Sequence, residues 1–293
     1  MRSISEIIEL AKKGEPRVIA VAAAHDKDVL TAVDTAAKAG LCKPILVGNG
    51  TAIKELMSDA AYPIMEAETD EDCAQIAVKL VRDGAANCLM KGILPTGTLI
   101  RAVLNKENGI RSGKLLSHVM AYETDIYDKL LFNTDGGVNV APTLEQKADI
   151  LENAAKMLSS LGYKTMTAAC ICGAEQVNPK IPATVDANEI AAMTDRFTPY
   201  GMTIIGPVGL DLAISKAACA HKHFEQVGGG DADILLFPNY EAGNVMGKTL
   251  TYFSGAKSAG VVVGAKVPIV LVSRADTAET KMSSIALGCV IGG

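Results

Sequence analysis

The sequence contains no tryptophan, and aromatic residues make up only 4% of its 293 residues. Proteins that hold single-stranded nucleic acid usually stack its bases on aromatic side chains. The formal net charge of -5 also provides no positive field that could hold a phosphate backbone. We therefore expect no nucleic-acid partner.

Long apolar runs are also absent, because no stretch approaches the ~18 unbroken apolar residues that a membrane span needs. Residues 1–15 form an amphipathic helix pattern with charges throughout, which is unlike a secretion signal. The cysteines lack C-x-x-C spacing, so we expect reduced, buried thiols in a cytoplasmic protein. They are Cys42, Cys73, Cys88, Cys170, Cys172, Cys219 and Cys289.

Several binding fingerprints are missing. No G-x-G-x-x-G follows the first predicted strand, and neither a P-loop nor a G-x-S-x-G motif occurs. His221 and His223 would not share a helix face, and Cys170 and Cys172 are better explained as two buried thiols than as zinc ligands. We find no cluster of Asp ligands either, so we expect no metal site.

The composition, with 49% hydrophobic and 21% charged residues, is that of a globular protein, and the length predicts two domains. Apolar runs alternate with helical patterns through the first hundred residues, as in parallel strands with crossover helices. The strands are expected at 17–23, 43–47, 63–66 and 87–90, and the helices at 26–39, 49–58, 70–83 and 95–104.

The alternation breaks between about 109 and 140, where runs at 115–121 and 129–134 follow one another without a helix. An antiparallel pair fits this segment best. From residue 143 the alternation returns, and near-continuous apolar strands imply sheets covered on both faces. These later strands are expected at 165–172, 202–206, 233–237 and 266–272, with a closing helix from about 276. We therefore expect two α/β lobes, with ligands at the carboxyl ends of strands.

Strand 233–237 leads into a helix whose first residues are small and polar. Asn239, Gly243 and Asn244 lie at its start, and Lys248 follows on the same helix. A helix amino-terminus presents unpaired N–H groups and partial positive charge, so it can hold an anion without a metal. This segment is therefore a candidate substrate-binding site.

Strand 266–272 leads into Ser273, Arg274, Asp276 and Glu279 at the start of the last helix. The planar guanidinium of Arg274 suits phosphate oxygens. A third candidate is the end of strand 87–90. Lys91 and Gly92 stand there, and Arg101 lies on the helix that follows.

Each of these residues also has a structural explanation. Arg274 and Asp276 could form a surface pair, and Asp276 and Glu279 could be favourable first-turn charges. Asn244 could satisfy backbone groups in a turn, and Gly243 could allow a special dihedral angle. The segments taken one at a time leave these alternatives open.

Taken together, the motifs resemble the phosphate acetyl/butyryltransferase family, and within it the butyryl-transferring members. The residues that carry the resemblance are Phe237–Asn244, Asn178-Pro179-Lys180 with Thr184, Lys91-Gly92, Gly206-Pro207 with Asp211, and Ser273–Asp276. The match covers nearly the whole chain in order.

This resemblance implies two α/β lobes of the isocitrate/isopropylmalate dehydrogenase type, with a cleft between them and a homodimeric assembly. The first lobe would comprise residues 1–108 plus 264–293, and the second 109–263. Acyl-CoA and phosphate would meet in the cleft, so coenzyme A would be a substrate and no cofactor would be needed.

The family chemistry makes phosphate itself the nucleophile, so the protein positions two anionic reactants and stabilises charge. By analogy, Ser273 would hydrogen-bond the carbonyl oxygen or the departing thiolate, and Arg274 would hold phosphate or the oxyanion. One departure matters: the acetyltransferases have an Asp seven residues after the Ser, where this chain has Thr280. Glu279 or Asp276 could take its role, and the departure favours a butyryl or branched-acyl substrate.

The sequence therefore predicts reversible acyl transfer from CoA to phosphate, with Ser273, Arg274 and Glu279 as catalytic residues. Three alternatives stay open: a phosphate acetyltransferase, a non-catalytic acyl-CoA binding protein, and a metal- and NAD-dependent dehydrogenase of similar fold. The dehydrogenase would need the Asp cluster that is missing.

Overall fold

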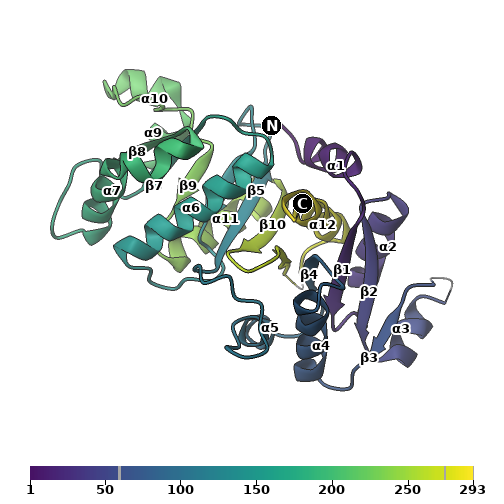
Figure 1. Cartoon of the computed structure of the whole chain (residues 1–293). Coiled ribbons are helices and arrows are strands. Elements are labelled where there is room, and N and C mark those ends of the chain that lie inside the picture. The colour runs from purple at the N-terminus through teal and green to yellow at the C-terminus, as the bar shows by residue number, and fades with distance from the viewer. Residues whose placement is uncertain (59–60, 274, 293) are drawn as a thin grey trace. The chain divides into compact units, whose positions relative to one another are not determined.

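The computed structural model describes residues 1–58, 61–273 and 275–292. By the contacts between Cα atoms, the chain divides into two compact units, each of them formed from more than one segment. Unit 1 comprises Met1–Ser3 and Leu115–Lys257, and unit 2 comprises Ile4–Lys114 and Ser258–Gly293. Figure 1 labels many of their elements. We describe the two units separately.

Unit 2 is an α/β unit whose strands lie in the order β3-β2-β1-β4-β11-β10. All neighbouring strands in it are parallel except β10, which runs antiparallel to β11. Its elements are α1 (Ile4–Lys12), β1 (Arg17–Ala22), α2 (Lys27–Lys38), β2 (Cys42–Gly48), α3 (Gly50–Leu56), β3 (Ile64–Glu66), α4 (Asp70–Arg82), β4 (Cys88–Lys91), α5 (Thr96–Val103), β10 (Lys257–Val263), β11 (Ile269–Val270) and α12 (Ala278–Ile291).

Helices bury the central strands of unit 2 over most of their length. Residues 19–22 of β1 and 88–90 of β4 have no measurable exposure. Helix α12 packs on α1 and α2, and α4 packs on β1 and α5. From β1 the chain adds β2 and then β3 on one side, and it then adds β4 on the other side of β1. The strand order therefore reverses between β1 and β4. Ligands of open α/β sheets bind outside the carboxyl ends of strands at such a point.

Unit 1 contains a mixed sheet in the order β5-β6-β9-β7-β8. β5 is antiparallel to β6, as the sequence predicts, and the other pairs are parallel. Its elements are β5 (Ser117–Glu123), β6 (Leu131–Thr134), α6 (Leu144–Ser160), β7 (Met166–Ile171), α7 (Pro182–Ala192), α8 (Thr194–Phe197), η1 (Thr198–Tyr200), β8 (Met202–Val208), α9 (Leu210–Ile214), α10 (Lys216–His221), β9 (Ile234–Leu236) and α11 (Tyr240–Phe253).

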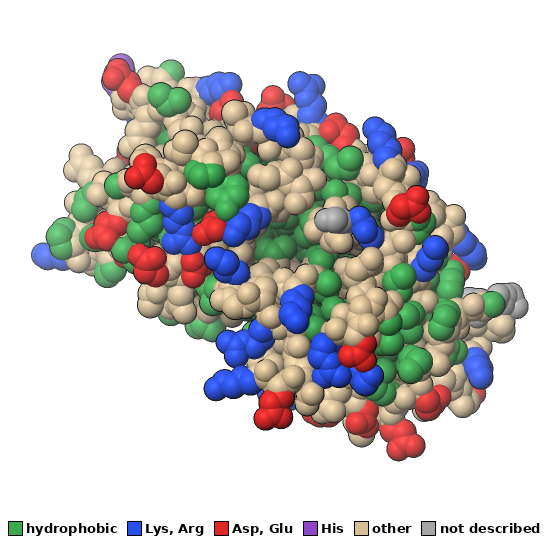
Figure 2. Space-filling view, viewed as in Figure 1, with side chains coloured by type: hydrophobic (Ala, Val, Ile, Leu, Met, Phe, Trp, Pro, Cys, Tyr) green, Lys and Arg blue, Asp and Glu red, His purple; other side chains and the backbone are tan. Residues whose placement is uncertain are grey.

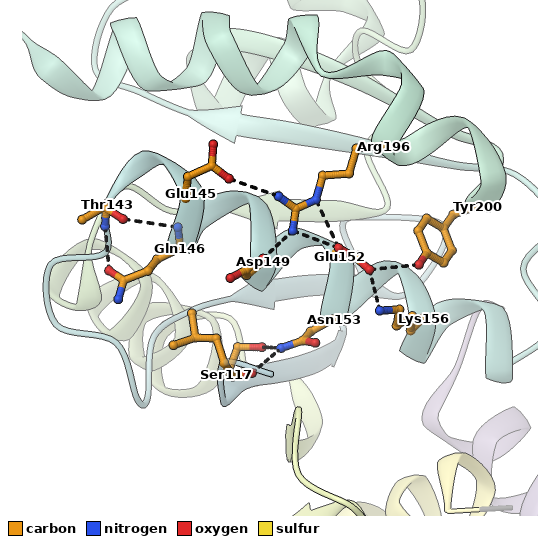
Figure 3. A network of polar contacts seen from close by, with 11 residues as sticks. Ser117, Thr143, Glu145, Gln146, Asp149, Glu152, Asn153, Lys156, Arg196 and Tyr200 are labelled. Atoms are coloured by element: carbon orange, nitrogen blue, oxygen red, sulfur yellow. Dashed lines mark hydrogen bonds and ion pairs between the residues drawn. The ribbon is translucent and has the colours of Figure 1, made fainter. Parts of the chain in front are cut away.

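A polar network ties α6 to α8 on the outside of unit 1 (Figure 3). Arg196 of α8 forms ion pairs with Glu145, Asp149 and Glu152, which lie along one face of α6. Burial disfavours the charged form of Glu152, but hydrogen bonds from Lys156 and Arg196 outweigh it and lower the pKa of Glu152 to about 2. The network therefore stabilises unit 1 while Glu152 is ionised.

The structure confirms the mixed α/β class and differs from the expected elements in two places. The strand expected at 266–272 has only two residues in ladder geometry, Ile269–Val270. Pro268 has no N–H to donate, so the ladder cannot extend through it. Strand β10, Lys257–Val263, was not among the expected strands, although it is almost wholly buried.

Candidate active site

A tight turn follows β11 and carries Ser273. The N–H of Ser273 donates to Oδ2 of Asp276 at 2.8 Å, and the N–H of Asp276 donates back to the carbonyl of Ser273 at 3.2 Å. The N–H of Ala275 donates to Oγ of Ser273 at 3.3 Å. Since Oγ accepts this bond, its own hydrogen can be donated outward. Arg274, the second candidate of this turn, lies outside the described residues.

Helix α12 starts directly after this turn. The side chain of Thr277 caps the helix by accepting from the N–H of Thr280, and it donates its hydroxyl hydrogen to Oγ1 of Thr280 at 3.2 Å. Glu279 lies exposed in the first turn. Thr280 therefore presents a hydroxyl that accepts a hydrogen bond from the N-cap residue.

Lys281, one residue further on, was not a candidate in the sequence. Its side chain is buried, and its Nζ donates to the carbonyl of Asp276, within the Ser273 turn. No sequence signal marks it, because a lysine in a helix is ordinarily a solvated residue.

Lys91 and Gly92 lie at the end of β4, beside β11 and β1. Lys91 is 4% exposed, and its Nζ donates to the carbonyls of Gly92 at 3.0 Å and Leu94 at 3.2 Å. A Cβ on Gly92 would lie 2.1 Å from the carbonyl oxygen of Ala23, so only glycine allows this approach to β1. Unit 2 therefore brings Lys91, Gly92 and Ser273 to the carboxyl ends of adjacent strands.

Arg101 lies on α5 at the edge of a hollow of about 380 Å³ between α4 and α5. Its guanidinium donates to Oγ1 of Thr98 at 3.1 Å, and the same guanidinium nitrogen lies 3.8 Å from Oε1 of Glu71. Lys79 and Arg82 of α4 also line this hollow. Lysine and arginine side chains gather over the α4–α5 part of the face in Figure 2. Glu71 is the acidic residue in the lining, and Asp83 pairs with both Lys79 and Arg82, so the lining has more cationic than anionic side chains.

The other candidates lie on α11 of unit 1. Oδ1 of Asn239 caps the helix by accepting from the N–H of Ala242 at 3.0 Å, and Nδ2 of Asn244 donates to the carbonyl of Gly136 at 3.0 Å. A Cβ on Gly243 would lie 2.7 Å from the carbonyl oxygen of Asp135. Asn239, Gly243 and Asn244 therefore all have structural contacts. Lys248 is exposed, with Nζ 6.0 Å from the centre of the Tyr252 ring.

The loop after β6, against which α11 packs, was missed by the sequence reasoning. Asp135 is 2% exposed, and Oδ1 accepts from the N–H groups of Gly137 and Val138 at 2.7 and 2.9 Å. Oδ2 accepts from the N–H of His118, and from the N–H and Nδ2 of Asn139. One buried carboxylate thus organises the carboxyl end of β6. The Asp-Gly-Gly sequence suggests a turn, but it does not show that the carboxylate is buried.

All seven cysteines are free and buried, as the sequence predicts. Burial raises the pKa of Cys170 and Cys289 to about 12 and that of Cys172 to about 11. Because the thiolate is the nucleophilic form, these thiols are poorly suited to covalent catalysis near neutral pH.

Two further findings concern the described residues only. They contain no group of three or more His, Cys, Asp and Glu side chains that could hold a metal ion. Within residues 1–58, 61–273 and 275–292, none of the helices combines the length and the apolar character that crossing a membrane requires.

Comparison with known proteins gives consistent results. A family model described as "Phosphate acetyl/butaryl transferase" matches residues 3–73 and 60–289. A phosphate butyryltransferase of Clostridium acetobutylicum is 43% identical over 298 residues, which cover 100% of this chain and 99% of that protein. A phosphate acetyltransferase of Thermotoga maritima is 36% identical over 291 residues, 98% of this chain and 99% of that one.

A crystal structure of a branched-chain phosphotransacylase from Enterococcus faecalis is similar to this chain with a TM-score of 0.85. The two sequences are 34% identical, and the match covers 94% of this chain and 99% of that one.

Proposed function

This chain belongs to the phosphate acetyl/butaryl transferase family, and we propose that it transfers butyryl or a branched short-chain acyl group reversibly between coenzyme A and inorganic phosphate. It is a phosphate acyltransferase with acyl-CoA and phosphate as substrates. The observation that carries the proposal is the full-length similarity to a phosphate butyryltransferase. The Ser273 turn at the end of β11 is the geometry that supports it.

In the proposed reaction, a phosphate oxygen attacks the carbonyl carbon of the thioester. A C–O bond forms, and the carbonyl electron pair becomes an oxyanion. When the oxyanion collapses, the C–S bond breaks, and the sulfur leaves as a thiolate that takes up the proton given up by the attacking hydrogen phosphate. The products are acyl phosphate and CoA, with no covalent enzyme intermediate. The raised thiol pKa values agree with this route, since no cysteine is needed as a nucleophile.

Ser273 is the proposed donor to the developing negative charge, because its Oγ already accepts a bond from Ala275 and its hydrogen is left for the substrate. Arg274 is proposed to hold phosphate, as in the family pattern. One such donor in a preorganised site is worth ~2.7 to 4 kcal/mol of transition-state stabilisation.

Glu279 is the proposed proton acceptor toward the CoA thiol in the reverse direction. The carboxylate of Asp276 is already engaged by the N–H of Ser273, and Thr280 is engaged in capping. Glu279 is the exposed carboxylate in the first turn of α12. It is therefore better placed for proton transfer than Asp276.

The remaining substrate contacts are proposed from charge and position. Arg101 would hold a phosphate of CoA at the α4–α5 hollow, where Lys79 and Arg82 add positive charge. Lys91 would make the end of β4 electropositive, and Gly92 would let substrate approach the backbone there. On α11, Asn239, Gly243, Asn244 and Lys248 would bind the second anionic reactant, supported by the helix amino-terminus.

We also propose that no resident cofactor or metal takes part, since phosphate is the nucleophile and the protein's cations can supply the charge. Seven free, buried cysteines fit a reducing compartment such as the cytoplasm.

We propose a homodimer because the family resemblance implies one and because one face of α11 exposes large apolar side chains. On α11 the side chains of Val245, Tyr252 and Phe253 are 64, 67 and 89% exposed. A second copy covering this face would remove them from water. Analytical ultracentrifugation should give twice the chain mass, and Tyr252→Asp with Phe253→Asp should give the chain mass. A monomeric wild-type protein would refute the dimer.

Phosphate acetyltransferase is the nearest rival, because a relative with that name also matches the full length. The two enzymes would differ in the size of the pocket for the acyl chain. One methylene group changes the free energy that discriminates between acyl chains by only ~1 to 3 kcal/mol. A non-catalytic acyl-CoA binding protein would bind the thioester without turnover.

The test is to supply purified protein with phosphate and each of acetyl-, butyryl- and isobutyryl-CoA, and to follow release of the CoA thiol. We expect the highest kcat/KM with the four-carbon substrates. A maximum at acetyl-CoA would favour the rival, and binding without any release would favour the sensor.

A further inference from the structure

Lys281 occupies an unfavourable place for a cation. It lies in the first turn of α12, the end of a helix that carries partial positive charge. Its side chain is only 2% exposed. Burying an ammonium group costs free energy unless the group is well paired, and the helix end adds repulsion. A lysine here therefore needs an explanation other than solubility.

The side chain of Lys281 contacts the Ser273 turn. Its Nζ donates to the carbonyl oxygen of Asp276, and it forms no ion pair in the described part of the chain. Lys147, another buried lysine, is different, because Asp186 neutralises it at 2.5 Å. The described structure therefore gives the Lys281 side chain a carbonyl partner and no carboxylate partner.

The carbonyl that Lys281 holds belongs to the residue that closes the Ser273 turn. Asp276 accepts from the N–H of Ser273 through its carboxylate and donates its own N–H to the carbonyl of Ser273. Fixing the Asp276 peptide therefore fixes the backbone on which the Ser273 hydroxyl stands. Lys281 connects to the proposed catalytic group through a single intermediate residue.

We propose that Lys281 is a positioning residue for acyl transfer, which orients Ser273 by holding the Asp276 carbonyl and places a buried positive charge behind the turn. This inference rests on the proposed function. In a site with little water, an oriented charge acts strongly on a developing oxyanion and costs no reorganisation during the reaction. A misplacement of about 1 Å in such a group can lower the rate by about 10²-fold.

The first experiment replaces Lys281 by Met, which fills similar space without charge, and measures kcat and KM for butyryl-CoA and phosphate. We expect kcat to fall roughly 10- to 100-fold with both KM values within about twofold of wild type. The matched control is Ile285→Val, which loosens the buried face of α12 without touching the Asp276 carbonyl. It should leave kcat unchanged.

The second experiment combines Lys281→Met with Ser273→Ala. If Lys281 acts through Ser273, the double variant should be no slower than Ser273→Ala alone. Losses that multiply in full would show that Lys281 does not act through Ser273 and would overturn the positioning role. Lys281→Ala should regain part of its kcat when methylammonium or ethylammonium is added, whereas Lys281→Met, whose cavity is filled, should not.

The outcomes distinguish a failure of the proposed function from a failure of the positioning role. An inactive wild-type protein would refute the proposed function itself. An active wild type with a Lys281→Met variant as fast as Ile285→Val would refute only the positioning role. Should Lys281→Met not fold, Lys281→Gln carries the same test, because its amide can still donate a hydrogen bond while the charge is lost. Full activity of that variant would contradict the role of the charge.

Discussion

In the proposed mechanism, Ser273 is the residue on which acyl transfer depends most. Its Oγ accepts from Ala275, and its backbone is held on both sides by Asp276, so the hydroxyl direction is restricted before substrate arrives. Preorganisation of this kind lowers the reorganisation needed at the transition state. The same contacts are the ordinary contacts of a capped turn, so activity measurements must distinguish the two roles.

Ser273→Ala should lower kcat for butyryl transfer by roughly 10²- to 10³-fold, because one donor to the oxyanion or thiolate is lost. The KM for butyryl-CoA should change little, since the bond forms mainly in the transition state. Steady-state kinetics check this, with the thermal midpoint of the variant as control. A kcat within threefold of wild type would mean that the turn is structural only.

The raised pKa values of the buried thiols predict how the cysteines respond to thiol reagents. Because burial raises the pKa of Cys170, Cys172 and Cys289, few thiolates exist in the folded protein at pH 8. We expect an aromatic disulfide reagent to titrate almost no thiol in the native state and all seven after denaturation. Iodoacetamide should leave turnover intact. Rapid loss of activity with one equivalent of either reagent would show that an essential thiol had been overlooked.

At the scale of elements, α4 and α5 form the hollow that Arg101 borders. Arg101→Ala should raise the KM for butyryl-CoA about tenfold and leave kcat near wild type, because a contact to a remote CoA phosphate contributes equally to the ground and transition states. The effect should shrink at high salt, where exposed charges are screened. A matched control is Lys106→Ala, which removes an exposed cation that does not line the hollow. Equal KM values for the two variants would contradict the assignment.

The strand and helix pattern was predictable where apolar periodicity was strong. The parallel strands of both units and the antiparallel β5–β6 pair follow from runs of Val, Ile and Leu and from the absence of an intervening helix. β10 was missed because its residues, Lys257–Val263, begin with small and polar side chains and directly follow a long helix. β11 was overestimated because Pro268 interrupts a run that is otherwise apolar.

The sequence predicted that the candidate residues lie at the ends of strands. It did not predict which atoms they contact. Motifs indicated Ser273, Lys91 and Asn239, since small polar residues after buried strands stand out in a sequence. Lys281 and Asp135 were not found, because what distinguishes them is their burial and the backbone groups that they hold. Hydropathy patterns contain no information about either.

At the scale of the molecule, acid stability should depend on the α6–α8 network. The pKa of Glu152 is lowered from 4.5 to about 2, so its contribution to stability is present above pH 4.5 and is lost as the pH falls toward 2. Denaturant midpoints measured from pH 6 to pH 2.5 should fall more steeply for wild type than for Glu152→Gln, which cannot titrate there. Parallel curves would show that this carboxylate does not contribute to acid unfolding.

Above all, we propose that this molecule joins an acyl group to phosphate using its own side chains. The most direct measurement is phosphorus NMR of purified protein with butyryl-CoA and phosphate in the presence of EDTA, with Ser273→Ala as the parallel sample. We predict a growing acyl phosphate signal, equal in amount to the CoA released, which is nearly absent from the variant. Thiol release without acyl phosphate, or turnover that stops on chelation, would contradict it.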